Sequence, residues 1–228
     1  MINVQFKHAP FSNSILNDEC GRYLNFVTED LNKDRPDRFW ILTNESTQLF
    51  TYGTKSVHNS AEQPSMLNGI PVMPQIRSGG ITYHGPGQLT WICMLNYRRL
   101  VRHGDVLNLD DLLERLRLAV NAEFDENLVA NYADPGLYRA SDEKILSYGA
   151  DAPGVLWVAL KVSLNLHVDL DVYQDTTICG VHNRPMGNLL PSRPDLATQA
   201  QIGENIMRRF CDLIYLDGHQ IVDWVEQP

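Results

Sequence analysis

The chain has 228 residues, of which 43% are hydrophobic and 21% charged, and its formal net charge is -9. This length and composition predict one globular domain over residues 1–228 and exclude intrinsic disorder and a coiled coil. The excess of acidic residues argues against a general nucleic-acid binder, because such proteins need a basic face to displace counterions from phosphates.

Targeting and membrane-spanning signals are not recognisable in the sequence. The first seven residues lack the basic start and apolar run of a signal peptide, and no later stretch is long enough to cross a bilayer. The four cysteines are spaced too widely for a disulfide-stapled secreted scaffold. We therefore expect a soluble, cytoplasmic protein with reduced thiols and no membrane partner.

The first half of the chain carries one helical pattern and several β patterns. Apolar residues recur at helical spacing before Pro36, and β-rich runs follow. The turn dipeptide Asn68–Gly69 precedes another short run. These patterns predict a helix over 16–31 and strands over 39–43, 48–52, 70–73 and 88–96. The strands over 39–43 and 48–52 are expected to be neighbours, and the strand over 88–96 is expected in the centre of a sheet.

The second half combines two amphipathic helices with further strands. Leucines on one face and acids in the first turn predict a helix over 109–124. Residues 157–168 alternate so strictly that they predict a long strand with one polar face, which could be solvated or could line a site. The other predicted elements are a hairpin over 137–139 and 143–149, a β-branched run over 176–180 and a closing helix over 202–214.

The segment from Arg77 to Gln88 is the most unusual in the chain. It packs four glycines, a proline, an arginine, a histidine and three hydroxyl residues into twelve positions. Glycine lets backbone approach a ligand, and Gly85–Pro86–Gly87 predicts a tight turn. A ligand-lining loop between two strands is one interpretation, and a glycine-rich surface hairpin is the other.

Cys179 is the candidate nucleophile among the four cysteines. Cys20, Cys93 and Cys211 fall within apolar patterns that predict core positions, whereas Cys179 ends a β run beside Gly180. Cys179 and His182 form a C-x-x-H pair, but no second ligand pair occurs at metal spacing, so a zinc site is excluded. No P-loop or dinucleotide fingerprint is present, so we expect no cofactor.

The glycine segment resembles the R-G-G-x-x-T-Y-H-G-P-G-Q signature of the octanoyl transferases of lipoate biosynthesis, the lipoate-protein ligase B family. Residues 133–138 are similar to the family's A-P-G-V-Y segment, 144–149 to K-I-x-S-L-G, 162–170 to L-A-L-N-V-x-x-D-L and 178–180 to P-C-G. The resemblance implies an α/β (α+β) fold with a mixed or antiparallel central sheet flanked by helices, similar to the catalytic domain of biotin and lipoate protein ligases.

The resemblance also implies an activity. The family moves an octanoyl group from octanoyl-acyl carrier protein to a lysine of a lipoyl domain, in 2-oxoacid dehydrogenases or the glycine cleavage H protein. Cys179 would carry the acyl group as a thioester, and Lys144 would be the catalytic lysine. A free thiol has a pKa of ~8.5, so a nearby cation is needed to favour the thiolate. No ATP is needed, because the change from thioester to amide is downhill. We also expect the protein to be a monomer.

The implied substrate-binding residues lie in three segments of the sequence. They are Arg77, Ser78, Gly79, Gly80, Thr82, Tyr83, His84, Ser147, Tyr148, Gly149, Lys161, Val162 and Ser163.

Four positions depart from the family pattern. Ser78 replaces a glycine, Ile178 a proline, and Leu160–Lys161 a His-Gly pair. We expect Lys161 either to add a cation near Cys179 or to shorten the space for the alkyl chain, unless its strand face is solvated. The chain is then an enzyme with an altered donor or acceptor, or a paralogue that binds without turnover. Retention of Cys179 and Lys144 together favours the enzyme.

A basic stretch follows the central strand. Arg98, Arg99 and Arg102 could recruit acidic carrier partners that the net charge otherwise repels, or could form a solvated turn.

Overall fold

The computed structural model describes most of the chain. The described residues are 1–12, 15, 18, 22–23, 25, 35–54, 64–75, 77, 80–102, 105–151, 156–178, 181–182, 184–215 and 217–225. Most of the helix predicted over 16–31 lies outside these ranges.

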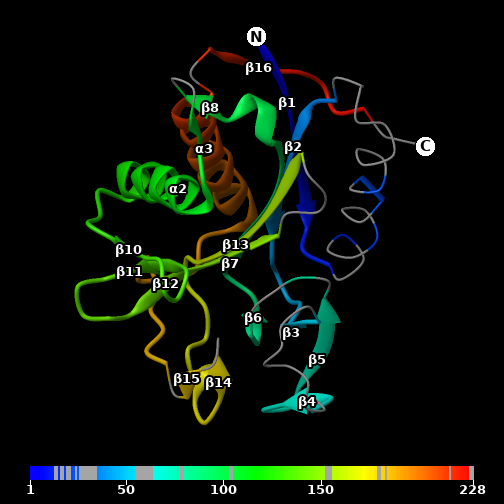
Figure 1. Ribbon diagram of the computed structural model, residues 1–228. Coiled ribbons are helices and arrows are strands. Elements are labelled where there is room, and N and C mark those ends of the chain that lie inside the picture. Colours follow the sequence, from blue (N-terminus) through cyan, green and yellow to red (C-terminus); the bar gives the residue numbers. More distant parts are fainter. Residues whose placement is uncertain are drawn as a thin grey trace.

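An eight-stranded mixed sheet forms the centre of the molecule (Figure 1). In order across the sheet its strands are β10 (Val129–Asn131), β11 (Gly136–Tyr138), β12 (Lys144–Asp151), β13 (Trp157–Asn165), β7 (Gln88–Asn96), β2 (Asp37–Thr43), β1 (Ile2–Pro10) and β16 (His219–Ile221). β1 pairs in parallel with β2 and β16, and the other pairs are antiparallel. The expected mixed sheet, with 88–96 at its centre, is confirmed.

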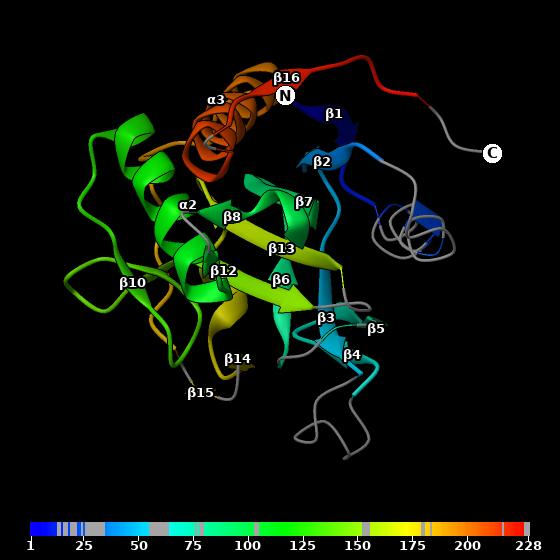
Figure 2. The same ribbon diagram turned by 45° about the horizontal axis from the view of Figure 1, so that its top comes forward.

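The two long helices cover one face of this sheet. α2 (Leu109–Phe124) and α3 (Leu196–Ile214) lie side by side in Figure 2. Their apolar residues share one core cluster with the odd-numbered residues of β7 and the even-numbered residues of β13. Asn108 and Asp111 form a capping box at the start of α2, and Asp195 caps α3. The predicted helices are confirmed, although α3 begins six residues before its predicted start.

The opposite face of the sheet is also covered. Trp40, Ile92 and Trp157 belong to a second buried cluster on that side. Further along β13, Ser163 and Asn165 are only 6% and 2% exposed. The polar face of β13 is therefore buried and not solvated. The strand ends at Asn165, three residues earlier than predicted, because the amides of His167 and Val168 donate to the Gly87 carbonyl and to the Asn188 side chain, outside the sheet.

A smaller four-stranded sheet lies beside this second face. Its order is β4 (Met66–Leu67), β5 (Ile70–Gln75), β3 (Leu49–Gly53) and β6 (Thr82–His84). The predicted Asn68–Gly69 turn joins β4 to β5, with φ of 49° and 76° at its two residues. Short elements complete the structure: η3 (Tyr97–Arg99), β8 (Val101–Arg102), β9 (Asp105–Val106), η4 (Asp171–Tyr173), β14 (Thr177–Ile178) and β15 (Val181–His182).

The expected pairing of the strands over 39–43 and 48–52 is wrong. They correspond to β2 and β3, which belong to different sheets. The side chain of Asn44 donates to the Thr47 carbonyl at 2.9 Å and accepts from its amide at 3.0 Å. Asn44 also accepts a backbone hydrogen bond from Gly87 at 3.1 Å. This side-chain-stabilised turn sends β3 away from β2, toward β5 and β6.

The basic stretch after β7 is only partly a surface feature. Arg99 donates to the carboxylate of Asp37 and to the Arg35 carbonyl, and its side chain is 12% exposed. Asp37 is fully buried, and burial raises its pKa to about 6 although Arg99 opposes this effect. Arg98 is exposed, and the side chain of Arg102 is outside the described part of the structure. Arg99 therefore does not fit the expected recruitment patch, because it stabilises the fold.

Replacing Arg99 with methionine is expected to lower the free energy of unfolding by about 3 kcal/mol at pH 8, because it leaves a buried carboxylate without its cation. The loss should shrink at pH 5, since the orphaned Asp37 then takes up a proton and becomes neutral. Urea unfolding at both pH values measures this difference. Arg98→Met is the control, with an expected change within about 0.5 kcal/mol. Equal losses in both variants would contradict a structural role for Arg99.

Candidate active site

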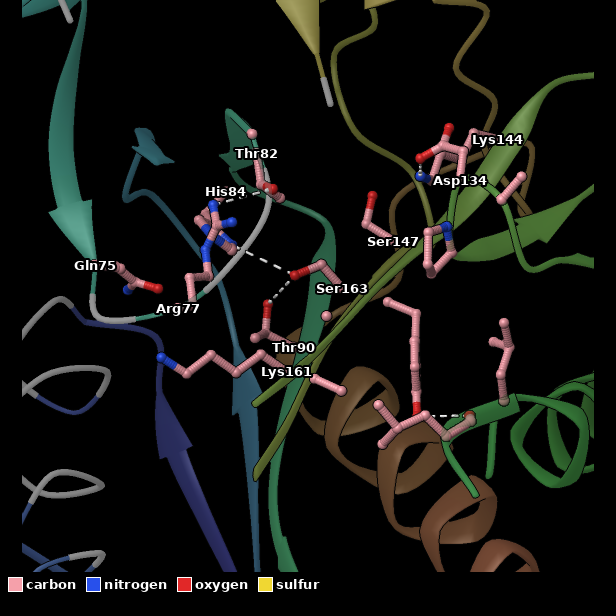
Figure 3. A pocket seen from close by; sticks show the side chains of 18 of the residues that line it. Gln75, Arg77, Thr82, His84, Thr90, Asp134, Lys144, Ser147, Lys161 and Ser163 are labelled. Atoms are coloured by element: carbon pink, nitrogen blue, oxygen red, sulfur yellow. Dashed lines mark hydrogen bonds and ion pairs between the residues drawn. The ribbon is translucent and has the colours of Figure 1, made fainter. Parts of the chain in front are cut away.

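A cavity of about 390 Å³ lies between β12, β13, β6 and the start of α2 (Figure 3). This volume is in the range of small-molecule sites. The predicted site residues that line it are Arg77, Gly80, Thr82, His84, Lys144, Ser147, Tyr148, Gly149, Lys161 and Ser163. Three separate segments of the sequence therefore meet around one hollow.

Lys144 occupies one end of the cavity, at the first position of β12. Its side chain is only 1% exposed. Its backbone is fixed on both sides, by hydrogen bonds to Pro185 at 2.9 Å and from Gly187 at 3.1 Å. Gly136 makes room for it, because a Cβ at that position would lie 2.7 Å from Lys144 Cε and 2.3 Å from the Leu146 carbonyl. The lysine is thus held in one place by its neighbours.

Asp134 binds the amine of Lys144 with an Nζ–Oδ1 distance of 2.8 Å. Its other oxygen accepts from the hydroxyl of Tyr138 at 2.5 Å and pairs with Arg184 at 2.7 Å. Burial alone would raise the pKa of Asp134, but hydrogen bonds from Lys144 and Tyr138 outweigh it and lower the pKa. Two cations share one carboxylate, so the cluster has one positive charge in excess and favours an anion nearby.

His84 lines the cavity beside Arg77 and is neutral (Figure 3). Gln88 donates its amide to Asn165 and to a backbone carbonyl, so its Oε1 accepts from His84 Nδ1 at 3.1 Å. The hydroxyl of Thr51 then donates to Nε2 at 3.1 Å. Burial lowers the pKa of His84 to about 3, and the charge of Arg77 adds to this effect. We assign it the Nδ1–H tautomer, without a role as a cation.

Part of the glycine segment forms one wall of the cavity, through Arg77, Gly80, and Thr82 and His84 of β6. Arg77 donates to the carbonyl and hydroxyl of Thr51 at 2.9 and 3.1 Å and to Thr82 at 3.2 Å. The tight turn at Gly85–Pro86–Gly87 is confirmed by the bond from the Gln88 amide to Gly85 at 3.0 Å. Gly87 has a φ of 82°, and a Cβ there would lie 2.0 Å from a backbone oxygen of the 165–168 bend.

Some of the family-like residues lie elsewhere. Tyr83 packs against Phe50 and Tyr173 in a separate small core, and Val162 faces the helices, so neither side chain lines the cavity. Cys179, Ser78 and Gly79 lie outside the described residues. Cys93 and Cys211 are buried, and burial raises the pKa of both thiols. Neither of these two is placed to act as a nucleophile.

Several lining residues were not expected from the sequence. Besides Asp134, they include Gln75, Thr90 and the N-terminal residues of α2, Leu109, Asp110 and Leu113. Asp134 stands inside the 133–138 segment, where an acidic residue beside a proline is typical of an exposed turn. Only its contact with Lys144 reveals a role at the site.

Metal-binding clusters and membrane-spanning helices are both absent from the described ranges. Within them, no group of three or more His, Cys, Asp or Glu side chains could hold a metal ion. No helix in the described part of the chain is long and apolar enough to span a membrane.

Comparisons with known proteins agree on a family. The model of the lipoyl protein ligase A/B catalytic domain matches residues 23–211. An octanoyltransferase of Erwinia tasmaniensis is 30% identical over 202 residues, covering 88% of this chain and 84% of the relative. One of Neisseria gonorrhoeae is 33% identical over 150 residues, covering 65% and 68% of the two chains.

A solved structure supports the same fold. The putative lipoate protein ligase of Thermoplasma acidophilum with bound lipoic acid superposes with a TM-score of 0.64 at 12% identity, covering 99% of this chain and 90% of that one. At this identity the likeness concerns the fold alone. Because the family match spans most of the sequence, the chain belongs to the lipoyl protein ligase A/B catalytic domain family.

Proposed function

We propose that the protein is an acyltransferase that moves an octanoyl group from octanoyl-acyl carrier protein to a lysine of a lipoyl domain. The observation that carries the proposal is the buried Lys144, fixed by Asp134 at the end of a cavity large enough for an acyl chain. The relatives named octanoyltransferase support the reaction. We propose that it acts as a cytoplasmic monomer on lipoyl domains of 2-oxoacid dehydrogenases or of the glycine cleavage H protein.

In the first step the thiolate of Cys179 attacks the thioester carbonyl of the donor. A bond forms between the Cys179 sulfur and the acyl carbon, and the bond from that carbon to the carrier sulfur breaks. The carrier leaves as a thiolate and takes up a proton. The excess positive charge of Lys144, Asp134 and Arg184 favours the attacking thiolate, and Arg184 follows Cys179 by five positions.

In the second step the neutral amine of the acceptor lysine attacks the acyl-Cys179 thioester. A carbon–nitrogen bond forms, the carbon–sulfur bond breaks, and Cys179 leaves as a thiolate stabilised by the same cations. The attacking nitrogen loses a proton, which returns to solvent. Because an amide is more stable than a thioester, both steps proceed without ATP.

The cavity provides a defined place for the acyl chain during both steps. The neutral His84 is bonded to Gln88 and Thr51, so it is satisfied without a ligand and presents its ring to the cavity. Leu109 and Leu113 add apolar lining from α2. An enclosed chain excludes water from the acyl-enzyme, which protects the thioester from hydrolysis.

The transfer is tested by mixing the protein with octanoyl-acyl carrier protein and a lipoyl domain, without ATP, and measuring the intact mass of the domain. We expect one octanoyl increment on the domain, and none on a domain whose acceptor lysine is replaced by arginine. A stable complex with no mass change on either protein would favour the alternative, a paralogue that binds these partners without turnover.

A further inference from the structure

The cavity has a second polar end, opposite Lys144. Gln75 lies at the end of β5 and is 2% exposed. Its Nε2 atom is buried and has no hydrogen-bond partner among the residues that the structure describes. A buried polar group without a partner is unfavourable, so the side chain favours a ligand that can hydrogen-bond to it. Figure 3 shows Gln75 on the same side of the cavity as Arg77 and the amine of Lys161.

Lys161 reaches this end from the middle of β13. It pairs with Gly149 on one side and Ile92 on the other. Gly149 has no side chain to fill the space beside it. Arg77 and the amine of Lys161 lie on the same side of the cavity as His84, and besides burial both charges lower the pKa of this histidine.

Among the residues that the structure describes, the carboxylates that line the cavity, Asp110 and Asp134, belong to other elements. Asp110 lies in the first turn of α2, and Asp134 precedes β11 and is bound to Lys144 and Arg184. We call the end formed by Gln75, Arg77 and Lys161 the distal subsite. It offers cationic and amide donors at the end of the cavity away from Lys144. If the acyl carbonyl lies near Lys144, as the proposed transfer requires, the far end of the acyl chain lies at this subsite.

We propose that the distal subsite binds a carboxylate, so that the cavity accepts a medium-length acyl group ending in a carboxylate as well as a plain octanoyl group. This inference rests on the proposed acyl transfer. A carboxylate accepts hydrogen bonds from the ammonium of Lys161 and the amide of Gln75, and Arg77 adds a further positive charge. A terminal methyl group offers none of these contacts and leaves the polar groups less well solvated.

Two donors with eight carbons test the proposal, octanoyl-acyl carrier protein and 7-carboxyheptanoyl-acyl carrier protein. The measured quantity is the ratio of their kcat/KM values for transfer to a lipoyl domain. In Lys161→Met, which keeps the length of the stem and removes the charge, the ratio of carboxylated to plain donor should fall about tenfold or more. Lys161→Arg should retain the ratio, and Gln75→Met should lower it. A ratio that stays within about twofold in Lys161→Met overturns the proposal.

Binding of the free acids separates this proposal from the proposed transfer. Calorimetry with octanedioate and octanoate should show tighter binding of octanedioate to the wild type, and loss of that preference in Lys161→Met. If neither donor is transferred but this preference is found, the transfer proposal fails and the distal subsite stands. If the octanoyl donor alone is transferred and octanedioate binds no better than octanoate, the distal subsite is wrong and the transfer stands.

Discussion

Cys179→Ser is expected to abolish the acyl-enzyme and to lower kcat/KM for octanoyl transfer by at least about 10³-fold, because a serine hydroxyl is a far weaker nucleophile than a thiolate in this setting. Incubation with octanoyl-acyl carrier protein, followed by intact mass measurement, should add one octanoyl group to the wild type and none to the variant. The excess cationic charge beside Lys144 favours a thiolate but does little for a hydroxyl of much higher pKa.

Matched controls come from the two buried cysteines. Cys93→Ala and Cys211→Ala should both keep the octanoyl increment, because their thiols are enclosed in the core below α3 and burial raises their pKa. An increment that persists in Cys179→Ser, or disappears in either alanine variant, would place the acyl group on another residue. Release of the increment by hydroxylamine shows that the bond is a thioester.

Local periodicity was enough to predict the central elements. The leucine pattern of 109–124 repeats over several helical turns, and the alternation of 157–168 repeats over several residue pairs. Patterns of this length are reliable, and the structure has α2 and β13 at these places. The pairing of β2 and β3 failed because a four-residue turn at Asn44 decides the direction of the chain. The strands β1 and β16 at one edge of the sheet were not predicted. β16 spans only three residues, and its partner β1 lies more than 200 residues away in the sequence.

The burial of both faces of β13 could not be predicted from the sequence either. Its alternation shows that one face is polar, but whether that face meets water depends on the second sheet, which is assembled from β3 to β6. Judged from the alternation alone, Ser163 and Lys161 could be ordinary exposed residues, whereas in the structure both line the cavity. The family-like segments identified most of the lining because each carries residues of an unusual type and order.

Asp134 shows why a site residue can be missed. It precedes Lys144 by ten positions, and the two meet because β11 and β12 pair with Tyr138 opposite Lys144. That register includes an irregularity between Leu137 and Tyr138, which no sequence pattern predicts. The charge balance of the site, with one carboxylate between two cations, was therefore available only from the structure.

Lys144→Ala and Asp134→Asn are expected to change the reactivity of Cys179 in opposite directions. Removing the lysine takes the excess positive charge away, which disfavours the thiolate and should slow alkylation by iodoacetamide about tenfold or more at neutral pH. Neutralising Asp134 leaves the cations of Lys144 and Arg184 without their carboxylate, so the thiolate should form at lower pH than in the wild type. The pH dependence of alkylation, followed by mass measurement of modified Cys179, gives both shifts.

Octanoyl transfer should nevertheless fall in both variants. We expect about 10³-fold in kcat for Lys144→Ala and about 10²-fold for Asp134→Asn, because the asparagine keeps the shape but weakens the bond that holds the amine in place. Urea unfolding checks that each variant is folded, since breaking a buried ion pair can cost about 3–5 kcal/mol. Asp142→Asn, an exposed aspartate in the turn between β11 and β12, is the control for charge alone. If both alkylation profiles overlie that of the wild type, Cys179 does not meet this cluster, and the charge of Lys144 and Asp134 must serve another group.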